Sequence, residues 1–214
     1  MPAKRIFAPV VGMVTMVVLF AASARAQKNE LALTVGSAFV STQTVLNPPT
    51  GDPNPRIHFG NEVEITFDYA RLLARAKIFG FHAEVPVAIY PRMDLNTGAD
   101  QVPKDIGALF VTPSIRMNIF SGDSVTPWVS VGGGYGHFRE AGELNYYGTN
   151  PGPTSTNTGV VQFGTGLDVW FWHRWGFRAE ARDFWSGAPT LGEAQTGLSR
   201  QHNYYVGVGV THRF

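Results

Sequence analysis

The sequence lacks cysteine and, beyond its first 26 residues, any apolar run long enough to form a membrane-spanning helix. Such a helix needs ~20 consecutive apolar residues, so the rest of the chain cannot cross a bilayer as helices. Disulfides are excluded too, and stability must come from hydrogen bonding and packing. Lysine is scarce, although a domain that faces water normally carries many charged side chains on its surface.

The first 26 residues have the pattern of a secretory signal peptide. Lys4 and Arg5 precede an apolar stretch at 6–22, and the small residues at 23–26 form an A-x-A cleavage site. We expect cleavage after Ala26. A retained membrane anchor is the alternative, and a proline and a glycine within the stretch disfavour it.

The positive net charge belongs to this leader. Without residues 1–26, the 17 basic residues become 14 against 16 acidic ones, and the formal charge changes from +1 to −2. The remaining basic residues are scattered singly among acidic ones, so no patch for a phosphate backbone is present. Nucleic acid is therefore not expected as a partner.

Residues 27–214 are predicted to form one all-β domain, because stretches with period-two alternation follow one another along the chain. Four long connections alternate with three short ones, as in outer-membrane barrels with long extracellular loops and tight periplasmic turns. The predicted strands are 31–42, 57–70, 76–90, 106–120, 126–139, 160–172, 175–185 and 203–214. The long connections are 43–56, 91–105, 140–159 and 186–202, and the short ones are 71–75, 121–125 and 172–175.

Alternation assigns the two faces of each strand. In the last strand an apolar set alternates with a set of small and polar residues, and the second, fourth and sixth strands do the same. A soluble barrel also alternates, but its charged face lies in water; glycines with a few charged residues fit a crowded barrel interior better. In the second strand the predicted outward set is Ile57, Phe59, Val63, Ile65, Phe67 and Tyr69. Aromatic residues near strand ends fit interfacial girdles, namely Tyr69, Tyr90, Phe120, Trp128, Trp172, Trp175 and Trp185.

The last strand, 204–214, resembles the C-terminal signal that the barrel assembly machinery recognises, on Gly209 and the terminal Phe214. The chain from residue 27 to its end is similar to the small outer-membrane barrels, the family of outer membrane protein A, outer membrane protein X and the opacity adhesins. This resemblance implies a transmembrane, antiparallel up-and-down barrel of about 8 strands. It also implies the cell outer membrane with both termini periplasmic, and as partners the assembly machinery and outer-membrane lipid or lipopolysaccharide.

A set of charged residues is predicted to face the lumen and form a charge network. Buried charges must be paired, and eight strands leave an interior that side chains just fill, so a plug is favoured over a gated polar path. The candidates are Glu62, Glu64, Asp68, Glu84, Arg116, Asp168, Arg178, Glu180, Arg182 and Arg213.

We expect neither an enzyme nor a cofactor. Some small barrels that resemble this one are lipid A deacylases with a His-x-Ser pair, but none of the six histidines here has serine two residues later. The oxygen ligands at Asp94, Asn96 and Asp100 are better explained by turns than by a metal. The glycines at 132–136 lie in a strand pattern without a following helix, so a phosphate loop is not predicted.

The function expected is an envelope-structural or narrow porin-like role. Surface adhesion or ligand binding through the long loops is the alternative, particularly through 140–159 with its aromatic and polar residues. A lipid A modifying enzyme is the third hypothesis, and no residue pattern in the sequence supports it.

Overall fold

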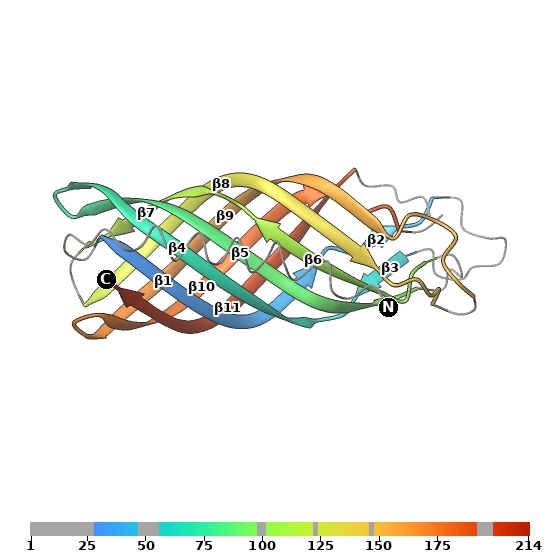
Figure 1. The fold of residues 1–214 in the computed structure, drawn as a ribbon, viewed down its shortest axis with the longest axis horizontal. Helices are drawn as coiled ribbons and strands as arrows, with labels where there is room; N and C mark the ends of the chain where they lie inside the picture. The colour runs from blue at the N-terminus through green and yellow to red at the C-terminus, as the bar shows by residue number, and fades with distance from the viewer. Residues whose placement is uncertain (1–27, 47–55, 98–101, 122–123, 146–147, 192–198) are drawn as a thin grey trace.

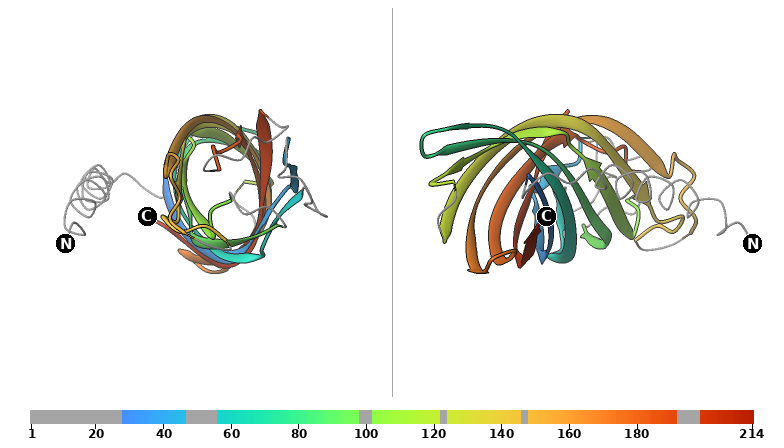
Figure 2. Two further views of the ribbon diagram at one scale, coloured as in Figure 1. Left: turned by 90° about the vertical axis from the view of Figure 1, so that its right-hand side faces the viewer. Right: turned by 60° about the vertical axis from the view of Figure 1, so that its left-hand side comes forward.

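Antiparallel pairing continues around the whole structure, a computed structural model that describes residues 28–46, 56–97, 102–121, 124–145, 148–191 and 199–214. The strands are tilted against the long axis of the molecule and form a ring when viewed along it (Figures 1 and 2). The predicted signal peptide lies outside the described residues. No helix in the part of the chain described here is long and apolar enough to cross a membrane.

Eight strand positions make up the ring, one of them shared by two consecutive segments. In ring order they are β1 (Asn29–Val40), β4 (Glu62–Ala76), β5 (Phe79–Asn96), β6 (Asp105–Val111) with β7 (Ser114–Ile119), β8 (Val125–Glu140), β9 (Ser155–Trp172), β10 (Trp175–Gly187) and β11 (Arg200–Arg213). Two short strands, β2 (Gln43–Thr44) and β3 (Arg56–Phe59), pair with each other, and β3 also pairs with the end of β5. The predicted eight-stranded antiparallel barrel is therefore confirmed.

The first and last strands close the ring. β1 pairs with β11 from Glu30↔Arg213 to Val40↔Asn203, without a register shift. Backbone bonds between Asn29 and Phe214 extend this ladder beyond the last strand residue. Closure leaves no free sheet edge along the wall, which is the condition for strands to cross a bilayer.

The strand shared by β6 and β7 is interrupted at Thr112 and Pro113. Proline has no amide hydrogen to donate to the ladder, yet both segments pair with β5 on one side and β8 on the other. The ladder is bridged by the amide of Thr112, which donates to the carbonyl of Pro86 at 3.2 Å, and by that of Gly133, which donates to Pro113 at 3.1 Å. The break is thus an internal kink in one wall strand.

The predicted faces are present along most of the wall. Large apolar side chains point outward and are partly exposed, such as Val63, Phe163 and Val208. Their neighbours in sequence point inward and are buried, such as Glu64 and Gln162. An apolar exterior around a polar interior is the reverse of a soluble barrel.

The prediction for the second strand and its following turn was wrong in two respects. It consists of two strands, β3 and β4, separated at Gly60 and Asn61. The expected turn at 71–75 belongs to β4, and the chain reverses at Lys77 and Ile78 instead, with Lys77 in a left-handed conformation (φ 53°). A register shift between Leu72 and Ala74 keeps β4 paired with β5 through this stretch, so the hairpin is longer than alternation predicted.

Four side chains lie on the opposite face from the one predicted. Ile57 is fully buried and Phe59 packs against the buried core, rather than pointing outward, because the break after β3 resets the alternation. Trp128 and Tyr90 were expected in interfacial girdles, but each is 1% exposed inside the barrel. Both occur two residues from other inward positions, so strand parity, rather than nearness to a strand end, decides their direction. Trp172 and Trp175, by contrast, are exposed at the short-turn end.

Short and long connections lie at opposite ends of the barrel. The β4–β5 and β9–β10 turns occur at the end that also holds the start of β1 and the end of β11, while β2 and β3 lie at the other end (Figure 1). The predicted long connection at 91–105 is shorter than expected, because β5 continues to Asn96.

The closing seam depends on two glycines. A Cβ on Gly209 would collide with the backbone of Leu33 and Thr34, and one on Gly36 with that of Val206 and Gly207.

We expect Gly209→Val to prevent β1 and β11 from pairing and to abolish the compact, heat-modifiable band on a gel of unheated refolded protein.

Gly159→Val is the matched control, because nothing lies within 4 Å of a Cβ there and valine favours strands. If Gly209→Val retained the heat-modifiable band to the same extent as this control, close approach at the seam would not limit closure.

Candidate functional site in the barrel lumen

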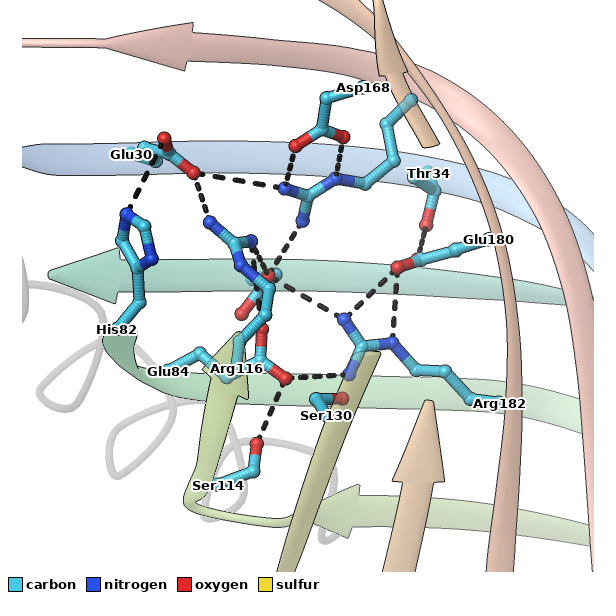
Figure 3. Close-up of polar contacts among 12 residues, drawn as sticks. Glu30, Thr34, His82, Glu84, Ser114, Arg116, Ser130, Asp168, Glu180 and Arg182 are labelled. Atoms are coloured by element: carbon cyan, nitrogen blue, oxygen red, sulfur yellow. Dashed lines mark hydrogen bonds and ion pairs between the residues drawn. The ribbon is translucent and has the colours of Figure 1, made fainter. Parts of the chain in front are cut away.

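Each of the eight strand positions of the ring sends at least one polar side chain into a common cluster in the lumen. Figure 3 draws part of this cluster, and Arg213 on β11 also belongs to it. The cluster lies toward the short-turn end, because along β10 the inward positions change from Arg178, Glu180 and Arg182 to Phe184 in the direction of the long connections. Four guanidinium groups and five carboxylates are joined by ion pairs. We call these nine residues and His82 the lumen network.

Arg178 joins opposite walls of the barrel. Its Nε and Nη2 donate to the two carboxylate oxygens of Asp168 on β9, at 2.7 and 2.9 Å. Its Nη1 donates to Asp68 Oδ2 on β4 at 2.7 Å. A two-pronged contact of this kind fixes both distance and orientation, so Arg178 holds its place without freedom to move aside.

Arg182 makes the second cross-barrel link. It donates to Glu180 Oε2 from Nε at 3.1 Å and to Glu84 Oε1 from Nη1 at 3.1 Å. The other oxygen of Glu180 accepts a 2.6 Å bond from Thr34, whose hydroxyl in turn accepts one from Tyr205 at 2.8 Å. The carboxylate of Glu180 is therefore bound by Arg182 on its own strand and by Thr34 on β1.

Arg116 and Arg213 meet at Glu30, near the short-turn end. Arg116 donates to one carboxylate oxygen of Glu30, and Arg213 Nε donates to the other at 2.8 Å. Arg116 also lies 3.5 Å from Asp68 and 3.6 Å from Glu84. Glu30 thus ties the strand that opens the ring to the strand that closes it.

A tryptophan lies among the arginines. The guanidinium carbons of Arg178 and Arg182 are each 5.1 Å from the ring centroid of Trp128, and that of Arg116 is 5.7 Å away. An aromatic face attracts cations, most strongly where water is excluded. Trp128 therefore separates three like charges while attracting each of them.

The lumen network includes most of the residues predicted from the sequence. The structure joins Asp68, Glu84, Arg116, Asp168, Arg178, Glu180, Arg182 and Arg213 through the pairs above. Glu64 is buried nearby and accepts a 3.4 Å bond from Thr66, but among the described residues no ion pair joins it to the network. Glu62 is partly exposed at the start of β4 and lies apart from it.

Sequence reasoning missed Glu30, His82 and Trp128. Glu30 lies two residues from Ala32 on the same face of β1, and His82 two residues from Glu84, so strand parity was a sufficient signal for both. His82 Nε2 lies 3.8 Å from Glu30 Oε1. The predicted assembly residues both lie on the closing seam, Gly209 against β1 and Phe214 beside Asn29.

A second layer, made of apolar side chains, fills the lumen toward the long connections. Phe110 is its centre: it stacks on Phe184 at 5.0 Å between ring centroids and meets Phe138 and Tyr90 edge-on at 5.6 and 5.9 Å. Residues from outside the eight-stranded ring complete it, namely Val45, Ile57, Val102 and Leu191. We call this group the apolar layer.

The interior of the barrel is filled by the lumen network and the apolar layer. Among the described residues no three histidine, aspartate or glutamate side chains gather in a way that could hold a metal ion. Asp100, one of the weighed metal ligands, and Tyr146 and Tyr147 of the 140–159 connection lie outside the described residues. The side chain of Asn145 in that connection is tied back to the carbonyl of Leu95 at 2.9 Å.

The fold is that of the small outer-membrane β-barrel proteins. The structure is similar to Neisserial surface protein A, NspA (10% identity, 87% of this chain and 97% of that chain, TM-score 0.51), and to the outer membrane protein OprG from Pseudomonas aeruginosa (12%, 88% and 97%, 0.52). It is also similar to the outer membrane protein AlkL, solved in lipid bilayers (14%, 90% and 93%, 0.51). No protein-family model and no curated protein matches the sequence.

Arg178→Ala would leave Asp168 and Asp68 without their closest cation. Removing one partner from a buried ion pair costs about 3–5 kcal/mol, so we expect the melting temperature of the protein in detergent to fall clearly. Circular dichroism during heating measures this temperature. Arg139→Ala, on the exposed outer face of β8, is the control and should change little. Equal melting temperatures for the two variants would show that the lumen network does not stabilise the barrel.

Proposed function

We propose that the protein is a non-enzymatic, integral outer-membrane barrel with a structural role in the cell envelope, and that it is closed to solutes. The single observation that carries this proposal is the double filling of the lumen, by the lumen network and then by the apolar layer. The narrow porin-like role considered from the sequence is the alternative that a filled lumen disfavours.

The outer surface supports membrane insertion. Trp175 and Trp185 lie at the two ends of β10 on its outward face, and both are exposed. Ten residues at ~3.3 Å each, tilted by ~40°, rise about 25 Å, which equals the apolar band of outer-membrane barrels. Exposed apolar residues such as Phe177 and Val206 lie on this face between the two levels.

The direction of insertion follows from the connections. In outer-membrane barrels the short turns face the periplasm and the long loops face outward. By this rule both termini of the barrel are periplasmic, the lumen network lies toward the periplasm and the apolar layer lies toward the cell exterior. The C-terminal strand would be the part presented to the barrel assembly machinery.

The two layers would block water and ions by different means. In the lumen network each arginine forms an ion pair with a carboxylate from another strand. The described arginines therefore form no row of unpaired positive charges along which an anion could cross the lumen. Aromatic and aliphatic side chains make up most of the apolar layer, the hydroxyl of Tyr90 is already bonded to Asn203, and hydrophobic constrictions close pores by dewetting. Three of the proteins with this fold are named as outer-membrane or surface proteins, which agrees with the proposed location.

The test is single-channel recording of the refolded protein in planar bilayers, after a heat-modifiability gel shows that the barrel has formed. We expect no reproducible conductance steps, because the layers act in series. Reproducible, ion-selective steps from the folded wild-type protein would overturn the closed-barrel proposal.

Variants of each layer sharpen this test. Arg178→Ala alone and Phe110→Ala alone should stay silent, since each leaves the other layer intact. Only the combined variant is expected to give brief, small conductance events. Large conductance from Phe110→Ala alone would show that the lumen network is permeable and that the apolar layer is the only seal.

A further inference from the structure

A sheet edge is left without a partner where β4 runs past the start of β1. The pairing of β1 with β4 ends at Asn29↔Arg71. One more backbone bond follows, from the amide of Leu72 to the carbonyl of Lys28 at 2.7 Å. β4 continues through residues 73–76, which β5 covers on one side. Among the described residues no strand pairs with this stretch on its other side.

This part of the β4–β5 hairpin stands clear of the barrel, at the left-hand end of Figure 1. Leu73 is 60% exposed, and Ala74, Arg75 and Ala76 are exposed as well. Because successive residues of a strand point to opposite faces, both faces of the hairpin are open here. A free edge that is reachable from both faces is what a strand from another chain needs in order to extend a sheet.

Three cations line this edge. Arg71, Arg75 and Lys77 are exposed, and within the described part of the chain none of them forms an ion pair. The carboxylate of Glu30, on the neighbouring strand β1, is buried and already bound in the lumen network. The edge therefore attracts acidic side chains.

The register shift in β4 distributes the cations over both faces. Arg71 pairs with Ala83 and Arg75 with Gly80, and these two partners point to opposite faces of β5. A strand added to the edge would therefore meet a positive charge on either face. Leu73, between the two arginines, offers an exposed apolar contact.

A second copy of this chain does not suit the edge. Antiparallel pairing of the edge with itself about Ala74 would place Arg71 opposite Lys77, and like charges directly opposite each other destabilise a strand pair. Cationic residues on natural edge strands prevent self-pairing in this way. The same cations favour a strand of opposite charge.

The level of the edge is given by the aromatic residues at the short-turn end. Trp175 pairs with His212, His212 with Leu31, and Leu31 with Tyr69. Tyr69 thus corresponds on β4 to the interfacial Trp175 on β10. Because the edge begins two residues after Tyr69, it lies on the aqueous side of the interface.

We propose that the edge of β4 at residues 71–77 binds an extended acidic segment of a periplasmic protein, which adds to the sheet as a further strand. The backbone of the segment would bond to the free edge, its carboxylates would lie beside Arg71, Arg75 and Lys77, and an apolar side chain would cover Leu73. The periplasmic location of this partner rests on the orientation proposed above for the barrel.

Nuclear magnetic resonance of the isotope-labelled, refolded barrel in a zwitterionic detergent tests the site, with three synthetic heptapeptides as probes. The first alternates glutamate and valine, and the second alternates lysine and valine. The third has the sequence of the first with a methyl group on every amide nitrogen, which keeps the charge and removes the backbone donors. We expect only the first to shift the amide signals of residues 71–78 and to slow their hydrogen exchange.

A charge-reversed variant has a matched control. Arg75→Glu should weaken binding of the first peptide about fivefold, the upper effect of one exposed charge pair. Arg139→Glu reverses an exposed arginine on β8 and should bind this peptide as the wild type does. Equal effects of the two variants, or equal binding of the methylated peptide, would overturn the proposal. So would soluble short-chain phosphatidylglycerol that shifted the same signals at a lower concentration than the peptide, because the cations would then belong to lipid headgroups.

The orientation is tested separately. The sequence has no cysteine, so Lys77→Cys provides a single label for a membrane-impermeant maleimide in whole cells. We expect labelling only after the outer membrane is permeabilised. Labelling of intact cells would overturn the periplasmic location of the partner and the proposed orientation, whereas the titration of the refolded barrel does not depend on orientation.

The dispersed signals of the ring strands report in each titration whether the barrel has formed.

Discussion

The rest of the structure depends on the hydrogen bonding of the backbone. A strand that crosses lipid must find a partner for every amide and carbonyl on both of its sides, and this chain meets the condition by pairing β1 with β11. Closure with eight strand positions fixes an interior that side chains just fill. The filled lumen therefore follows from the number of strands, and what remained for the sequence to decide was the chemistry of the filling.

The charged side chains in the lumen distinguish the inner face of the sheet from its outer face. An apolar lumen would make both faces of each strand alike, and a shift of one residue would exchange them without cost. With Asp68, Glu84 and Arg178 on one face, such a shift would place buried ions in lipid. Buried ion pairs contribute little net stability but are costly to break. The lumen network thus specifies which face of the wall is inside, and Trp128 allows three arginines to share a small space.

Alternation could be read from the sequence because water, lipid and lumen impose a period of two on every wall strand. It correctly placed most of the lumen network, including Arg116 and Asp168. The prediction of faces failed where the alternation is interrupted, and where a residue was placed by another criterion than alternation. Ile57 lies beyond a break in alternation, and Trp128 was assigned by its nearness to a strand end. The specific partner of each arginine was beyond prediction, because pairing across the barrel depends on strand tilt and on side chains from opposite walls.

The two layers of the lumen differ in where their residues come from, and this difference has a consequence for the exposed end. The lumen network is contributed by the wall strands alone, so it can form as soon as the ring closes. The apolar layer also needs Val45, Ile57, Val102 and Leu191, which lie outside the ring strands. Connections that would otherwise extend from the barrel are therefore drawn inward by burial of apolar surface. A partner that bound those segments would therefore compete with the packing of the layer.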